Sequence, residues 1–223
     1  MLKALTHLFY LELLLLFRRS QEWLYPLAFF MIVVCLFPLI FSPDPDISQK
    51  YIIGYIWIAA LFANLLAIET IFAHDLKEGY LEQLLLSNLP LTFLIIIKLA
   101  AQWMMSALPL ILLTPLIGFL FNLSFSTIGM VSLSLLLGTP VLTLLGSLCV
   151  TLTLELQQAG ILLGLLILPL ITPVLIFSVL LVQQQQNHLP FLAPLAFLAG
   201  LSFLTMTCLP WLIALTLRIS LGE

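Results

Sequence analysis

The chain has 223 residues, of which 63% are hydrophobic and only 8% are charged, and its formal net charge is −3. Soluble domains are about 45–50% apolar and about 25% charged, so this composition excludes a soluble domain and places most of the chain in lipid. The small net charge gives no indication of a nucleic-acid partner. In lipid the backbone must be paired within helices or closed barrels, and the long, continuous apolar runs favour helices. We therefore expect an all-α polytopic membrane protein.

Residues 1–22 are expected to form an amphipathic helix that lies along the membrane interface. Lys3 and Tyr10 share one face of such a helix, and Arg18 and Arg19 follow its apolar run. Arginines placed after the apolar run, without a small-residue cleavage site, argue against a signal peptide. We expect them to lie near the head groups of the lipid bilayer.

Six apolar stretches in residues 23–217 are expected to cross the membrane, since a crossing helix needs about 20 predominantly apolar residues. They lie at about 23–41, 51–72, 91–121, 128–152, 161–182 and 193–217. Polar turns are expected at 42–50, 122–127 and 183–190, and residues 218–223 form a short cytoplasmic tail. Gly138 and Pro140 lie in the middle of the fourth stretch and predict a kink or break there.

The basic residues predict the orientation of this bundle. If both termini lie on one side of the membrane, six of the seven lysines and arginines share that side, and Lys50 lies opposite. Because basic residues concentrate on the cytoplasmic side, both termini are expected in the cytoplasm.

The densest charge cluster lies between the second and third expected spans, in His74–Leu91. Leucines recur there at helical spacing, and the charged residues lie toward the other side. This pattern predicts an amphipathic coupling helix over residues 74–90, closed by Pro90, on the cytoplasmic surface. A soluble ATPase is expected to dock there, and on the N-terminal helix. The expected docking residues are Asp75, Leu76, Lys77, Glu78, Gly79, Glu82 and Leu85.

Two charges flank this element at the expected cytoplasmic ends of spans. The favoured interpretation directs Glu69 and Lys98 toward the head groups, with the Lys98 stem snorkelling outward. The alternative is a Glu69–Lys98 pair that braces the coupling element.

The sequence contains no catalytic or metal-binding motif: HExxH, GxSxG and the P-loop pattern GxxxxGK[ST] are all missing. The three cysteines are far apart and lack CxxC spacing, which favours small buried hydrophobic residues over a disulfide or a metal site. We therefore expect a non-catalytic subunit that uses ATP through a partner.

Histidines can ligate haem. His188, in an expected outer loop, is the candidate residue for a haem contact, although the favoured interpretation is an ordinary interfacial histidine.

The stretch EGYLEQLLLSNLP at 78–90, followed by Lys98, resembles a pattern of ABC-2-type exporter membrane subunits. In that pattern E/K-G-x-L-E-x-L-L precedes a proline and then a lysine. Further short motifs narrow the resemblance: LFPL (36–39), WIAAL (57–61), GTP (138–140), LPL (168–170), PVLIF (173–177), HLP (188–190) and LRIS (217–220). In this order and spacing, the chain resembles the haem exporter protein B (CcmB) family of cytochrome c maturation over nearly its whole length.

This resemblance implies a six-span subunit of the bacterial inner membrane that works with an ATP-binding subunit (CcmA-like). It also implies further membrane subunits (CcmC-like and CcmD-like), a haem chaperone (CcmE-like), and haem as the substrate. Two modes stay open: export of haem itself, and ATP-driven release of the haem-loaded chaperone without transport. The alternative is an ABC-2-type exporter of a lipid, a glycan or another apolar substrate. Six spans are half of the usual set, so we expect pairing with a second copy or another membrane subunit.

Overall fold

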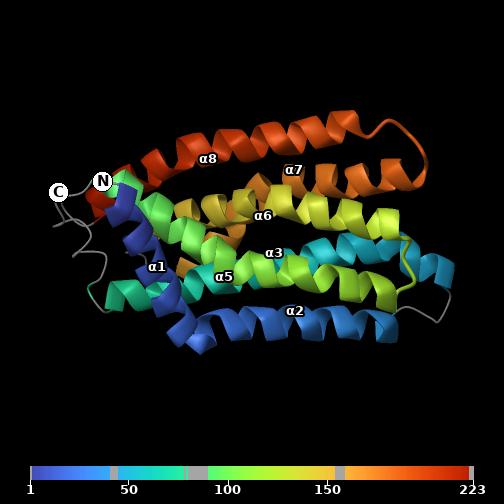
Figure 1. The fold of residues 1–223 in the computed structure, drawn as a ribbon, viewed down its shortest axis with the longest axis horizontal. Coiled ribbons are helices and arrows are strands. Elements are labelled where there is room, and N and C mark those ends of the chain that lie inside the picture. Colours follow the sequence, from blue (N-terminus) through green and yellow to red (C-terminus); the bar gives the residue numbers. More distant parts are fainter. Residues whose placement is uncertain (1, 41–44, 78, 80–89, 154–158, 221–223) are drawn as a thin grey trace.

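The computed structural model describes residues 2–40, 45–77, 79, 90–153 and 159–220, and each element in these ranges is an α-helix. The helices are α1 (Leu2–Arg18), α2 (Ser20–Ile40), α3 (Pro45–Lys77), α5 (Leu91–Leu120), α6 (Phe125–Thr153), α7 (Ala159–Gln186) and α8 (Leu192–Ser220). The six longer helices run along the long axis of the molecule, while α1 runs obliquely across the end that carries the N-terminus (Figure 1) and packs on α5.

Among the described residues, five helical stretches are long and apolar enough to cross a membrane: Tyr51–Glu69, Leu91–Leu120, Phe125–Thr153, Gly164–Gln186 and Leu192–Ile219. In α2 the apolar stretch Trp23–Leu36 is shorter. Each of these six stretches overlaps one of the six expected from sequence, with different ends. They confirm an all-helical polytopic membrane protein, while six crossings and the orientation stay predictions.

The neighbouring helices extend into all three of the expected turns. α3 begins at Pro45, where the fixed φ of proline suits a first helical turn. The four glutamines of the expected 183–190 loop belong to α7, since glutamine is a good helix former. The chain turns only after them, at His188, whose φ is 55°. The turn expected at 122–127 also ends earlier, because α6 begins at Phe125, and the Ser124 hydroxyl accepts from the Thr127 backbone N–H at 3.2 Å.

The central helix of the bundle is α6, which packs against α3, α5, α7 and α8. Its buried face includes several hydroxyl side chains that bond to the backbone of their own helix. The Thr143 hydroxyl donates to the Thr139 carbonyl at 3.1 Å, and the Ser147 hydroxyl donates to the Thr143 carbonyl at 2.7 Å. Such bonds let small polar residues lie in an apolar interior without unpaired groups, so that other helices approach closely.

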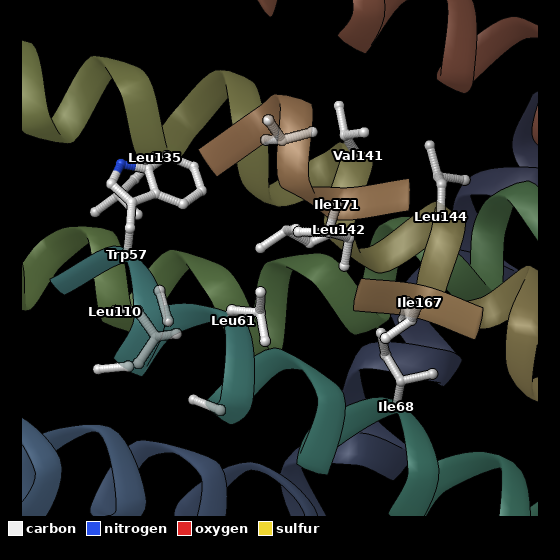
Figure 2. Packing of buried hydrophobic residues seen from close by; sticks show 14 of the residues in the cluster. Trp57, Leu61, Ile68, Leu110, Leu135, Val141, Leu142, Leu144, Ile167 and Ile171 are labelled. Atoms are coloured by element: carbon white, nitrogen blue, oxygen red, sulfur yellow. The ribbon is translucent and has the colours of Figure 1, made fainter. Parts of the chain in front are cut away.

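Trp57 of α3 packs against α6 and is fully buried beside Leu135 (Figure 2). Its indole N–H donates to the Ser134 hydroxyl at 3.2 Å. A Cβ on Gly138 would overlap the Trp57 ring. The helix α6 continues through Gly138 and Pro140, so the prediction of a break there is wrong. A kink at these residues stays a prediction. The observed role of Gly138 is to leave room for the indole.

Candidate functional site

The helix that enters the expected coupling element is longer than its apolar part. The membrane-length stretch of α3 ends at Glu69, and the helix continues to Lys77. His74–Lys77 are thus the last turn of α3, which corrects the prediction that a separate helix begins at residue 74. Gly79 then adopts a φ of 68°, a left-handed conformation in which glycine commonly ends a helix.

Part of the predicted docking set falls beyond this turn. Glu78, Glu82 and Leu85 lie outside the described residues, as do the side chains of Leu76 and Lys77. Docking on them stays a prediction. Asp75 is the member of the set whose side chain is described.

The Asp75 carboxylate is buried, with 3% of its side chain exposed, and it lies between two cations. The Lys98 ammonium contacts Oδ2, and the Arg19 guanidinium Nη1 lies 3.5 Å from Oδ1. The Lys98 side chain is 7% exposed and that of Arg19 is 28% exposed. Charged groups are buried in proteins when they are paired in this way. We call Arg19, Asp75 and Lys98 the ion-pair site.

The ion-pair site joins three separate parts of the chain. Arg19 is the residue between α1 and α2, Asp75 lies in the last turn of α3, and Lys98 lies two turns into α5. The segment 78–89 follows α3 and precedes α5 in the sequence. The site therefore lies where this segment is attached, and it ties both flanking helices to the junction between α1 and α2.

The acid that pairs with Lys98 in the structure is not the one considered from sequence. Lys98 pairs with Asp75, whereas the Glu69 side chain is exposed and makes no ion pair with Lys98 in the described structure. Lys98 is also buried instead of snorkelling outward. The physical reason is that the Asp75 carboxylate supplies, inside the protein, the counter-charge that a lipid head group would otherwise supply.

The N-terminal helix packs on α5 beside this site. Leu16 of α1 and Ala101 of α5 are buried together, and Leu13 and Met105 pack around them. On other faces of α1, Tyr10 is 61% exposed. The charged Glu12 of α1 is buried, so an amphipathic helix at the membrane interface stays a prediction.

Other buried polar contacts deeper in the bundle were missed by the sequence analysis. The Asn64 amide donates to the Thr143 hydroxyl at 3.0 Å, and the Trp103 indole N–H donates to the Thr139 hydroxyl at 3.0 Å. Both bonds cross between helices, from α3 and α5 to α6. A polar residue inside an apolar run is the sequence signal that could have found Asn64, because such residues commonly bond across helices.

His188 lies at the other end of the bundle, in the turn between α7 and α8 (Figure 1). Its exposed side chain lines a hollow of about 770 Å³ together with polar residues of α6 and α7. There the Gln185 amide donates to the Ser126 hydroxyl at 2.6 Å. Within the described ranges, no group of three His, Cys, Asp or Glu residues could hold a metal ion. A haem contact at His188 stays a prediction.

The comparisons with known proteins cover nearly the whole chain. The sequence model of the CcmB protein family matches residues 3–220. The chain belongs to the CcmB family. Heme exporter protein B of Pseudomonas aeruginosa is 45% identical over 212 residues, which are 95% of this chain and 95% of the relative. The protein of the same name from Haemophilus influenzae is 41% identical over 212 residues, 95% of this chain and 96% of the relative.

A third relative, heme exporter protein B of Escherichia coli K12, is 44% identical over 214 residues, 96% of this chain and 97% of the relative. These matches confirm the family resemblance found in the sequence. As a CcmB-family member with five membrane-length helices, the chain is a multi-pass protein of the bacterial inner membrane.

Proposed function

We propose that this chain is the membrane subunit of an ABC-type complex of cytochrome c biogenesis, which handles haem with energy from a separate ATP-binding subunit. The support for haem as the substrate is the name of its relatives, heme exporter protein B. We propose a CcmA-like ATPase, CcmC-like and CcmD-like membrane subunits and a CcmE-like haem chaperone as its partners. Family membership favours haem over the lipid or glycan substrates of other ABC-2-type exporters.

The proposed coupling path begins at the segment that follows α3. The ATPase docks on residues 78–89 and on the adjoining turn of α3, and the observation that carries this proposal is the buried ion-pair site at the attachment of that segment. A push on the segment acts on the end of α3, and Asp75 ties that end to α5 and to the α1–α2 junction. Separating a buried pair leaves uncompensated charge, so the three parts move together.

The proposed topology has six crossings, with α2 as the first. Both termini and the docking segment lie in the cytoplasm, because basic residues concentrate there. A second copy of the chain or another membrane subunit completes the transmembrane unit.

Of the two modes of action, the bundle supports chaperone release better than haem conduction. The buried hydroxyl groups of α6, such as those of Thr143, Ser147 and Thr153, are bonded to the backbone of their own helix. Groups bonded in this way offer little to a polar path, and the buried polar side chains without a partner, such as Gln102 and Ser178, are few in the described part of the bundle. In this mode ATP hydrolysis moves the membrane subunit, and the movement releases the haem-loaded chaperone.

Docking is tested by co-purification of the ATPase with full-length variants in mild detergent. Glu82→Lys and Leu85→Asp are expected to lose the ATPase while the membrane subunit still inserts. Glu69→Lys is the matched charge reversal, on an exposed acid of α3 outside the ion-pair site, and should retain it. Undiminished ATPase on Glu82→Lys and Leu85→Asp would contradict docking at this segment.

The mode of action is tested with the purified complex in vesicles. ATP-dependent release of haem-loaded chaperone, without movement of haem between the two sides, is expected. ATP-dependent movement of free haem across the bilayer would instead establish export.

A further inference from the structure

The turn between α7 and α8 has a defined geometry that holds one imidazole at the end of the bundle. The Leu189 backbone N–H donates to the Gln184 carbonyl at 2.8 Å. The His188 backbone N–H donates to the Gln185 carbonyl at 3.1 Å. These two bonds form the Schellman motif that ends many helices, and its left-handed residue, usually glycine, is His188 with a φ of 55°. A side chain kept at a position that favours glycine is a reason to ask what it does there.

His188 is exposed and lines the hollow of about 770 Å³ between this turn and the start of α6. The rest of the lining is one leucine and a set of neutral hydroxyl and amide side chains: Leu123, Ser124, Ser126, Thr127, Gln183, Gln185, Gln186 and Asn187. The Ser126 hydroxyl accepts from the Gln185 amide at 2.6 Å and can still donate its own hydrogen. Ligand pockets span about 300–1,000 Å³, so the hollow has the size of one. It offers a ligand one imidazole nitrogen and several hydrogen-bond donors.

The number of metal-binding side chains limits which ligand this imidazole can hold. In the ranges that the structure covers, His188 belongs to no group of three His, Cys, Asp or Glu residues, so it cannot hold a bare metal ion in the way a protein metal site does. Haem needs less from a protein, because the porphyrin supplies the equatorial nitrogens and one histidine commonly supplies the axial ligand. Its propionate groups also accept hydrogen bonds from hydroxyl and amide groups like those of the hollow.

We propose that His188 binds haem as an axial ligand of the iron, with the haem propionates at hydroxyl and amide groups of the hollow. The choice of haem rests on the proposed function, and the inference adds where this chain contacts it. The α7–α8 turn lies at the opposite end of the bundle from the N-terminus, and it is expected on the outer side (Figure 1). A contact there needs no path through the helices, so it agrees with haem that arrives on a chaperone.

The test is a titration of the full chain with haemin in mild detergent, followed by the Soret absorption band. His188→Gly removes the imidazole and puts at this φ the residue that fits it best, so the variant should fold with a Tm close to wild type. Its haemin affinity should fall by more than about tenfold, because losing only an outer-shell partner of a metal ligand already costs about 10–100-fold. His7→Ala, at an exposed histidine of α1, should retain the wild-type affinity.

A porphyrin without iron separates iron ligation from other contacts. Protoporphyrin IX should bind equally well to wild type and to His188→Gly. Ser126→Ala should weaken haemin binding by about tenfold, the low end for a hydrogen bond to a charged group. Because this variant keeps the imidazole, it should leave the position of the Soret band unchanged, whereas His188→Gly should shift it.

Equal haemin affinity and Soret position in wild type and His188→Gly would overturn the inference, as would a wild type that binds no haemin. Binding that is lost in His7→Ala instead, or protoporphyrin IX binding that falls as far as haemin binding in His188→Gly, would also overturn it. None of these results decides the proposed function, because the titration uses the chain without its ATPase. ATP-driven release of the haem-loaded chaperone by the whole complex tests that function separately.

Discussion

Replacing Asp75 with asparagine removes one charge from the ion-pair site and nearly preserves the side-chain shape. At the 3.5 Å separation of Arg19 and Asp75, the Coulomb attraction is about 5 kcal/mol at an effective dielectric of about 20. Because Arg19 is 28% exposed, solvent screening reduces its net contribution to about 1 kcal/mol or less. Lys98 is 7% exposed, and removing one partner of a buried pair costs about 3–5 kcal/mol.

Asp75→Asn is therefore expected to lower the free energy of unfolding by about 3 kcal/mol, the low end of that range, because Arg19 and Lys98 each have a further contact. In a chain of this length, 1 kcal/mol shifts Tm by about 2–4 °C, which gives a decrease of about 6–12 °C. Thermal unfolding of the full chain in mild detergent measures this shift. Glu69→Gln, at an exposed acid of the same helix, should change stability by less than about 0.5 kcal/mol.

A double-mutant cycle with Lys98→Met tests whether the Asp75–Lys98 pair accounts for this loss of stability. The double variant should be more stable than the sum of the single effects predicts, by about 0.5–3 kcal/mol, since contacting residues couple in this range. Additive effects, or an Asp75→Asn variant as stable as Glu69→Gln, would refute the reasoning.

Two further substitutions test the packing of α3 on α6. Gly138→Ala is expected to destabilise the chain by about 1–3 kcal/mol because the added methyl group meets the Trp57 ring. Gly129→Ala, whose added Cβ would lie in open space, should be neutral or stabilising, and equal Tm values for the two variants would contradict this. Asn64→Leu should leave Tm unchanged or raise it, because the lost bond to Thr143 is offset by removing a buried amide oxygen without a partner. A loss above about 2 kcal/mol would show that this bond matters more than such bonds usually do.

The existence of the helices could be predicted from sequence because lipid leaves the backbone few alternatives, whereas their ends could not. The apolar stretch that hydropathy detects ends at the first polar residues, but a helix does not have to end there. The glutamines of α7 continue that helix into the polar region because their own propensity is sufficient. Likewise, α3 extends past Glu69 for two further turns and ends only at Gly79, whose positive φ no hydropathy pattern reveals.

The ion-pair site could be predicted in part. From sequence, Asp75 was expected on the docking surface and Glu69 was the acid considered as the partner of Lys98, a choice that depended on where α3 was taken to end. Once α3 is continuous, the buried residues Trp57, Asn64 and Ile68 define one face at spacings of seven and four, and Asp75 follows seven residues later on that face. Arg19 could not be found in this way, because its approach depends on how α1 packs across α5.

The central claim is that force from ATP hydrolysis reaches the transmembrane helices through the ion-pair site. Its most direct test is the amount of c-type cytochrome matured per ATP hydrolysed, measured with the reconstituted complex carrying Asp75→Asn or, as the conservative control, Lys98→Arg. The account predicts that Asp75→Asn keeps the ATPase bound and active while maturation per ATP falls to a small fraction of wild type, and that Lys98→Arg retains most of it. Wild-type maturation per ATP in Asp75→Asn would contradict the account.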